Sequence, residues 1–179
     1  MAMDSLHGQL LVSSPALHDP NFRRTVVLIT HHDEEGAMGL VLSRPSEVRV
    51  EDAVAELADL PGADQLVYVG GPVQPEAVVV LVEHEDDPDS PIIGRIAFME
   101  AGSDLEELAV ARARVFAGYS GWGPDQLEGE LDENSWIIVP AEPDDVFAPD
   151  PDELWRTVLH RKGGKFALIA TMPFDPKLN

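Results

Sequence analysis

The sequence predicts an α+β fold in a single domain, and three observations lead to this prediction. The chain has 179 residues, near the usual size of one domain, and 44% of them are hydrophobic, which is enough for a core. Strand-like segments come mostly in runs, with helical segments inserted at irregular intervals, whereas a doubly wound parallel sheet would alternate them regularly. No linker, internal repeat or low-complexity tract divides the chain.

Short runs of β-branched and other apolar residues predict the strands. The strongest run, Arg24–Thr30, is apolar enough to be buried on both faces, and a short polar connection joins it to Ala37–Leu42. Such a connection predicts an antiparallel pair. Pro45 closes the second of these strands because it has no backbone N–H for a ladder. The expected strands are Gln9–Val12, Arg24–Thr30, Ala37–Leu42, Leu66–Val69, Ala77–Val82, Ile96–Met99, Val115–Tyr119, Trp136–Val139 and Phe166–Thr171.

Apolar spacing and capping residues predict four helices. In Val50–Leu60 the apolar residues recur at i, i+3, i+4 and i+7, and acidic residues occupy the opposite face. Ser103 and Glu106 have the spacing of a capping box. Pro124 is suited to the first position of a helix, and paired glycines are typical of a helix end. The expected helices are Val50–Leu60, one that starts at Ser103, Pro124–Asp132, and one from Asp150 to Gly163-Gly164.

The charge of the chain bears on its partners. Twelve Lys and Arg stand against 33 Asp and Glu, a net charge of −21. Duplex DNA and anionic lipid carry the same sign, so the mean field of the protein repels both. The densest basic group is expected to complement the dipole at a helix C-terminus. It consists of Arg156, Arg161, Lys162 and Lys165. We therefore expect no direct nucleic-acid binding and no membrane association.

The chain contains no cysteine, which excludes disulfides, thiolate metal ligands and thiol catalysis. Its first residues lack the basic and apolar regions of a signal peptide. No apolar run approaches the ~20 residues that span a bilayer. These observations predict a cytoplasmic protein.

Catalytic and metal-binding motifs are incomplete in this sequence. Residues 118–122 read Gly-Tyr-Ser-Gly-Trp, but a nucleophile elbow needs a small residue where Trp122 stands. Adjacent His31 and His32 would point to opposite faces of a strand and cannot share one ion. EF-hand, P-loop and dinucleotide-binding patterns are absent. We assign no catalytic residue, cofactor or metal ligand. A hydrolase or metal-dependent enzyme that uses Ser120 or the histidines is the alternative.

Glycine, aromatic and polar residues together form a candidate pocket. Glycines permit close backbone approach, aromatic side chains form pocket walls, and the guanidinium of Arg44 suits a carboxylate. The structural alternatives are packing for the aromatic residues, an internal salt bridge for Arg44 and a helix C-cap for Asn134. The candidate residues are Ser43, Arg44, Gly70, Gly71, Tyr119, Gly121, Trp122, Asn134 and Trp136.

The glycine–aromatic motifs occur in a fixed order with several others. The set comprises Leu6–Val12, Asp19–Phe22, residues 32–45 (His-Asp-Glu-Glu-Gly-Ala-Met-Gly-Leu-Val-Leu-Ser-Arg-Pro), Val69–Val73, Gly118–Trp122, Gln126–Glu128 and Asn134-x-Trp136. Together these motifs resemble the YqgE/AlgH family of bacterial proteins over nearly the whole chain. The resemblance implies a strongly bent, mixed or antiparallel sheet that forms a pseudo-barrel flanked by about four helices. The function of that family is not established, and some members carry the label of transcriptional regulator.

The sequence also departs from the family. Many relatives have cysteine where this chain has Thr30, so a thiol-based role cannot operate here. Many have Asn-Arg-Pro in place of Ser43-Arg44-Pro45, and alanine is common at position 120, which argues against a catalytic Ser120. We therefore expect a non-enzymatic domain that binds a small ligand or a protein partner, with an indirect regulatory role. A transcriptional regulator is a further alternative, and the net charge of −21 disfavours it.

Overall fold

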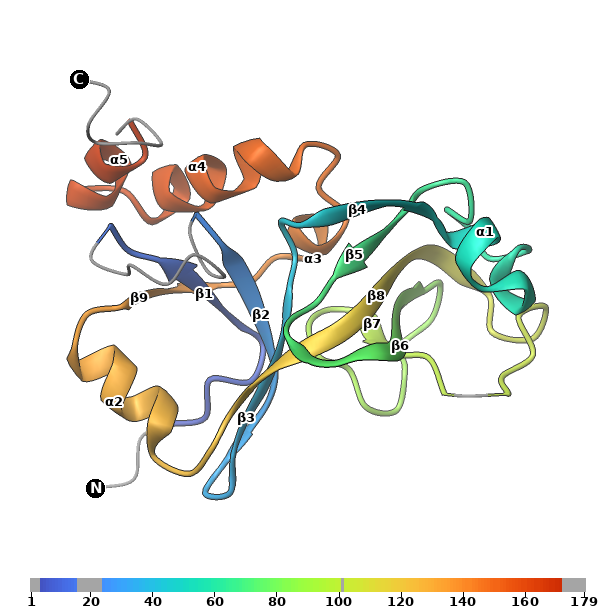
Figure 1. Ribbon diagram of the computed structural model, residues 1–179, viewed down its shortest axis with the longest axis horizontal. Helices are drawn as coiled ribbons and strands as arrows, with labels where there is room; N and C mark the ends of the chain where they lie inside the picture. The colour runs from blue at the N-terminus through green and yellow to red at the C-terminus, as the bar shows by residue number, and fades with distance from the viewer. Residues whose placement is uncertain (1–3, 16–23, 101, 172–179) are drawn as a thin grey trace.

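A computed structural model describes residues 4–15, 24–100 and 102–171, and within them one nine-stranded sheet organises the molecule (Figure 1). The strands are β1 (Gln9–Ser13), β2 (Val26–Asp33), β3 (Gly36–Val41), β4 (Pro45–Arg49), β5 (Leu66–Val69), β6 (Val73–His84), β7 (Ile96–Phe98), β8 (Val110–Trp122) and β9 (Trp136–Pro140). The helices are α1 (Val50–Ala53), the 3₁₀ turn η2 (Ala55–Leu57), α2 (Gln126–Asp132), α3 (Pro143–Val146), α4 (Pro151–Lys162) and α5 (Lys165–Ile169).

The sheet is mixed, which confirms the predicted α+β class. Its main path runs β4-β5-β8-β3-β2-β1-β9, with β6 paired to β8 and β7 paired to β6. The β5–β8 pairing is parallel, and the other pairings are antiparallel. The path has two ends, at β4 and β9, so the sheet is not closed.

Strand β8 joins the two halves of the molecule. Its first part pairs with β6, while its last three residues pair with β3. Figure 1 shows β8 crossing from the half built by β4–β7 to the half built by β1–β3 and β9. The bend coincides with the place where the Gly70–Gly71 link between β5 and β6 passes close to β8, and there a Cβ added to Gly70 would lie 2.3 Å from the carbonyl oxygen of Gly118. Gly118 itself has a φ of 72°, which favours glycine.

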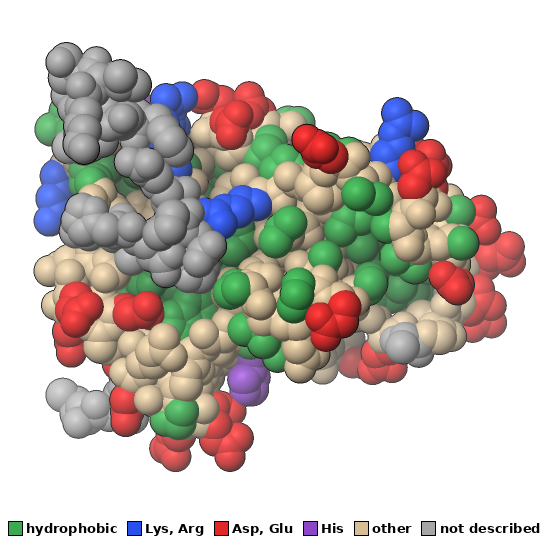
Figure 2. Space-filling view, in the orientation of Figure 1, with side chains coloured by type: hydrophobic (Ala, Val, Ile, Leu, Met, Phe, Trp, Pro, Cys, Tyr) green, Lys and Arg blue, Asp and Glu red, His purple; other side chains and the backbone are tan. Residues whose placement is uncertain are grey.

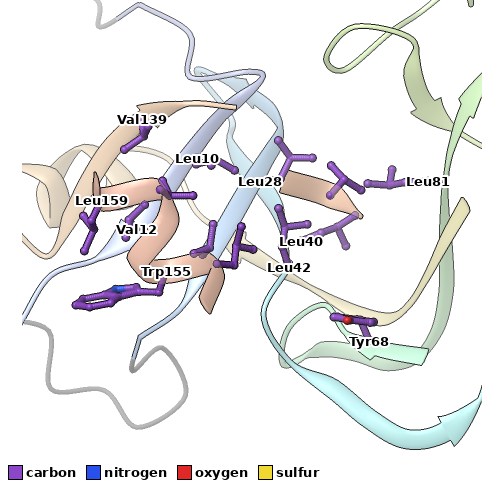
Figure 3. Close-up of a cluster of buried hydrophobic side chains, with 14 of the residues drawn as sticks. Leu10, Val12, Leu28, Leu40, Leu42, Tyr68, Leu81, Val139, Trp155 and Leu159 are labelled. Atoms are coloured by element: carbon purple, nitrogen blue, oxygen red, sulfur yellow. The ribbon is translucent and has the colours of Figure 1, made fainter. Parts of the chain in front are cut away.

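Buried side chains form three clusters against this sheet. The largest packs α4 onto the central strands, and Figure 3 shows Trp155 and Leu159 of α4 beside Val12 of β1. Tyr68 and Leu81 lie at the opposite end of the same cluster. The second cluster lies under α2 and the third under α1 and η2. Buried hydrophobic side chains therefore cover both faces of the sheet.

The predicted helix Val50–Leu60 is wrong over most of its length. Only α1 and the short turn η2 form, separated by Val54, which has extended backbone angles of φ −136° and ψ 97°. The amides of Val50 and Glu51 donate hydrogen bonds to the carbonyls of Gln65 and Ala63, and no regular helix follows them. Because Leu57 and Leu60 reach the third cluster from these turns, burial does not require the helix.

Two further predictions are wrong. No helix starts at Ser103, whose hydroxyl donates to the carbonyl of Glu100 and so forms no capping box. The residues that follow form turns before β8 begins at Val110. The predicted strand Phe166–Thr171 is helix α5, because Phe166, Ile169 and Ala170 have the i, i+3, i+4 spacing that packs one helical face on the largest cluster.

Other predictions differ at element boundaries. Helix α2 begins at Gln126 rather than Pro124, after Asp125 with a φ of 64°. Pro45 begins the edge strand β4, a position that tolerates proline. The fourth helix is confirmed as α4, where the Asp150 carboxylate caps the amides of residues 152 and 153 and Gly163 follows the last turn.

Candidate functional site

Strand β8 presents two arginines on one face. Its sequence reads Ala-Arg-Ala-Arg-Val-Phe over residues 111–116, and alternate residues of a strand share a face. Arg114 is directly opposite Leu81 of β6, and Phe116 is opposite both Val79 of β6 and Tyr68 of β5. Residues that oppose each other in the register lie on the same side of the sheet. Arg114 therefore faces the end of the largest cluster.

The guanidinium of Arg114 is buried without a carboxylate. The residue is 6% exposed, and its Nε and Nη1 atoms are buried with no hydrogen bond. Its Cζ lies 4.2 Å from the centre of the Tyr68 ring, in cation–π geometry. Desolvation lowers the pKa of Arg114, and the Tyr68 side chain partly opposes this shift. Within the described part of the chain, no acidic side chain forms an ion pair with it.

Two other partly buried arginines have acidic partners. Arg112 forms a bidentate pair with Glu83 at 2.9 and 3.0 Å and a second pair with Asp144 at 3.0 Å. Arg161 holds Asp145, whose side chain is 5% exposed, at 2.7 and 3.0 Å. These carboxylates raise the pKa of each arginine, in the opposite direction to the shift of Arg114.

A buried cation of this kind is suited to binding an anion. Moving an unpaired charge out of water costs several kcal/mol, and a bound anion offsets that cost through charge-assisted hydrogen bonds. Arg114 is not among the residues predicted from the sequence. The signal that identifies it is the Arg-x-Arg alternation directly before Val115 and Phe116, which places a charged side chain on an apolar strand face.

Ser43 and Arg44 of the predicted pocket lie near the start of β2. The Ser43 hydroxyl accepts a hydrogen bond from the amide of Val26, and Arg44 Nη2 donates to Thr25 Oγ1 at 3.2 Å. The carbonyl of Arg44 accepts from the amide of Val69, which ties this segment to β5.

Gly70, Gly71 and Tyr119 meet where the link between β5 and β6 crosses β8. A Cβ added to Gly71 would lie 2.2 Å from the carbonyl carbon of Tyr119. Tyr119 is partly buried and packs against the largest cluster, whereas Gly121 is exposed. Gly70 and Gly71 therefore allow two backbones to touch.

Trp122, Trp136 and Asn134 gather at α2. The two indole rings form an edge-on pair with centres 6.3 Å apart in the second cluster, and Trp122 Nε1 donates to Glu130 Oε2 at 2.6 Å. Asn134 has a φ of 59° just after the C-cap residue of α2 and is exposed. The nine predicted residues thus have contacts beside β2, at the Gly70–Gly71 link with β8, and at α2, and the Arg44–Val69 hydrogen bond joins the first of these places to the second.

The residues considered for catalysis have structural contacts. Ser120 is 1% exposed and its hydroxyl donates to the carbonyl of Gly70 at 3.2 Å. His31 contacts Asp33, and His32 contacts Glu128 on the other face, as the strand alternation predicts. Among the described residues, no group of three or more His, Asp and Glu side chains is arranged to hold a metal ion.

The basic group late in the chain is held by local contacts. Arg156 pairs with Glu153, and Lys162 donates to the carbonyl of Ile138. Arg161 and Lys162 occupy the last turn of α4, where positive charge complements the helix dipole. In the part of the chain that the structure describes, no helix combines the length and apolar character needed to cross a membrane.

Aliphatic side chains are exposed on the half of the molecule that carries Arg114. Figure 2 shows hydrophobic side chains gathered over this half, with acidic side chains around the rim. Val69 and Val78 are 40% and 50% exposed, and both are opposite Ala117 of β8. Because Ala117 follows Phe116, this patch lies on the sheet face away from Arg114.

Comparison with known proteins reveals relatives along the whole chain. A family model described as AlgH-like matches residues 10–167. A UPF0301 protein of Streptomyces coelicolor is 46% identical over 187 aligned positions, which cover 99% of this chain and 97% of the relative. A UPF0301 protein of Thermobifida fusca is 39% identical over 192 positions, which cover 98% and 96%.

Solved structures show the same similarity. A crystal structure of a protein from Corynebacterium diphtheriae has a TM-score of 0.86 at 30% identity, covering 95% of this chain and 93% of that chain. The solution structure of the AlgH protein from Pseudomonas aeruginosa has a TM-score of 0.71 at 30% identity, covering 97% of both chains. The resemblance seen in the sequence motifs is confirmed, and the chain belongs to the AlgH-like family.

Proposed function

We propose that this protein is a cytoplasmic, non-enzymatic domain that binds a small anionic ligand through Arg114. One observation carries the proposal. The guanidinium is buried with two nitrogens unbonded, in a chain that has 33 acidic residues and pairs Arg112 and Arg161 with them. A site that keeps its cation unpaired in so acidic a chain is suited to an anion from outside.

Binding is favoured over catalysis by the surroundings of this arginine. The side chains nearest it in the register are Leu81, Phe116 and Tyr68, and the first two are fully buried hydrocarbon. Leu81 and Phe116 have no nucleophilic or basic atom, and the Tyr68 ring is in contact with the guanidinium of Arg114 itself. Ser120 and His32 hold backbone or side-chain partners elsewhere. The site therefore supports recognition of charge without a reaction.

Thermal unfolding with a panel of small anions tests this function. The panel contains carboxylates, phosphate esters and sulfate, each at millimolar concentration and constant ionic strength. We expect at least one of them to raise the Tm of the wild-type protein, since a ligand that binds only the folded state stabilises it. Substitution Arg114→Met keeps much of the side-chain volume, removes the charge and should abolish the increase.

Arg49→Met is the matched control. Arg49 lies on the edge strand β4 with 61% of its side chain exposed, so this variant removes one positive charge away from the site. It should respond to anions as the wild-type protein does. An unchanged Tm with every anion, or an equal increase in Arg114→Met, would contradict the proposed function.

A further inference from the structure

We infer that an exposed row of three apolar residues, Val69, Ala117 and Val78, binds a basic segment of a partner protein that carries apolar side chains. The row crosses three strands, because Val69 of β5 and Val78 of β6 are both opposite Ala117 of β8. The three side chains therefore share one face of the sheet. This face is opposite to the one that carries Arg114, so the inference is independent of the proposed anion site.

The cover of this sheet face stops one row short. The neighbouring row is buried in the third cluster, under α1 and η2, and consists of Val67, Val115 and Val80. Ala117 packs against that cluster, while Val69 and Val78 on either side of it are 40% and 50% exposed. A partner that covers the exposed row would extend an apolar layer that already exists, and the removal of these valines from water would favour binding.

The charge around the exposed row specifies the partner. The elements that flank it carry exposed carboxylates, namely Glu47 of β4, Glu51 and Asp52 of α1, Glu56 of η2 and Glu76 of β6. Arg49 is the only Lys or Arg between residues 45 and 80, and it pairs with Glu51 at 3.8 Å. An apolar strip beside so many carboxylates is complementary to apolar side chains flanked by Lys or Arg.

A second copy of this chain lacks that complementarity. A two-fold dimer brings the same patch of both subunits together, so the carboxylates around the exposed row would face one another. Each copy also has a net charge of −21. Anionic lipid surfaces are repelled for the same reason. A basic protein segment instead gains from both the apolar row and the carboxylates, and we assign the surface to such a partner.

Selection from a library of random peptides displayed on phage tests the inference. With the wild-type protein as bait, we expect the selected peptides to combine Lys or Arg with Val, Leu, Ile or Phe. A synthetic peptide with the selected consensus is then titrated by calorimetry. Its Kd should be at least about tenfold weaker for the double variant Val69→Thr/Val78→Thr, which keeps the branched shape and the strand preference of valine.

Three measurements serve as controls. Leu168→Gln removes an aliphatic side chain of α5 that is 71% exposed, and it should bind the peptide as the wild-type protein does. Arg114→Met should also bind normally, because it alters the other sheet face. Val78→Thr alone should give part of the loss. An increase in NaCl from about 50 to about 200 mM should weaken wild-type binding severalfold, since salt screens the carboxylates.

Several outcomes would overturn the inference. They are no enrichment of any peptide, selected peptides without positive charge, and equal binding to the wild-type protein and the double variant. Equal binding would mean that the peptides respond only to the net charge of the protein. Loss of binding in Arg114→Met would place the peptide on the other face. A wild-type dimer in sedimentation velocity that the double variant dissociates would assign the exposed row to a second copy.

Discussion

Arg114 has two possible roles that differ in the sign of one measurement. As a structural residue it would stabilise the fold through its contact with Tyr68, 4.2 Å from the ring centre. Such contacts contribute about 2 kcal/mol or more when desolvated. As a ligand-binding residue without ligand it is an unpaired buried charge, which costs several kcal/mol. The second effect is larger, so the free protein should be more stable without the charge.

We therefore predict that Arg114→Met raises the free energy of unfolding of the ligand-free protein by about 1–2 kcal/mol. Arg161→Met should lower it by about 2–3 kcal/mol, because it leaves the buried carboxylate of Asp145 without its partner. Urea unfolding monitored by circular dichroism measures both. A loss of stability in Arg114→Met as large as that in Arg161→Met would assign Arg114 a structural role.

His32 links the segment before β1 to helix α2. Its Nδ1 accepts a hydrogen bond from the Leu6 amide at 2.9 Å, and its Nε2 lies 2.8 Å from Glu128 Oε1. The acceptor role of Nδ1 means that the proton of the neutral ring is on Nε2, which donates to the carboxylate. This hydrogen bond lowers the pKa of Glu128 from its ordinary value of 4.5.

The lowered pKa of Glu128 predicts a pH dependence. Because the carboxyl group is more acidic in the folded state, its stabilising contribution is complete above pH ~4.5 and is lost as the pH falls through the folded-state pKa. Between pH 5 and about 3, the free energy of unfolding should fall less steeply in Glu128→Gln than in the wild-type protein. Glu34→Gln, in the exposed turn between β2 and β3, should keep the wild-type slope. Parallel slopes for Glu128→Gln and the wild-type protein would contradict the prediction.

At the scale of elements, the crossing of the Gly70–Gly71 link over β8 depends on the absence of side chains. Gly71 has a φ of 156°, and an added Cβ would lie 2.2 Å from backbone atoms of Tyr119. Neither backbone can move without breaking strand pairings, including those between β5 and β8. The same crossing positions the face of β8 that carries Arg114.

We predict that Gly71→Ala lowers the free energy of unfolding by more than about 2 kcal/mol, through both the clash and the backbone strain. Gly129→Ala is the matched control, since Gly129 lies inside α2 with nothing within 4 Å of the added Cβ. That variant should raise stability by about 0.5–1 kcal/mol, because alanine favours the helix. Thermal unfolding of the two variants should give Tm changes of opposite sign, and equal changes would contradict this account.

The errors in predicted elements share a cause. The periodic pattern of Val50–Leu60 is real, and Val50, Leu57 and Leu60 are buried, yet the chain buries them from two separate turns. The apolar residues of α5 likewise have helical spacing, but the apolar composition of the segment led to the prediction of a strand. In both segments the apolar residues do reach the core. Whether a helix, a strand or separate turns bury them depends on packing against distant strands. The fourth helix was predictable because its signals, Asp150 and Gly163, are local.

For the whole molecule, the dominant physical fact is the charge of −21. Like charges at this density repel one another and favour expanded states, and salt screens that repulsion. We predict that raising NaCl from 10 to 200 mM increases the Tm by about 2–4 °C, which corresponds to roughly 1 kcal/mol for a chain of this size. KCl should act like NaCl, because screening does not depend on the identity of the ion. A decrease in Tm would contradict the prediction.

The sequence by itself determined the α+β class, the family motifs and most strands, because apolar alternation, capping residues and glycines act over a few neighbouring positions. It also supplied the alternation that places Arg112 and Arg114 on one strand face. Only the tertiary structure decided which of these two arginines is paired. Glu83 comes from β6 and Asp144 from α3, both far along the chain from β8, and no acidic side chain of the described residues pairs with Arg114. Whether a buried charge has a partner depends on such distant contacts, which local sequence patterns do not encode.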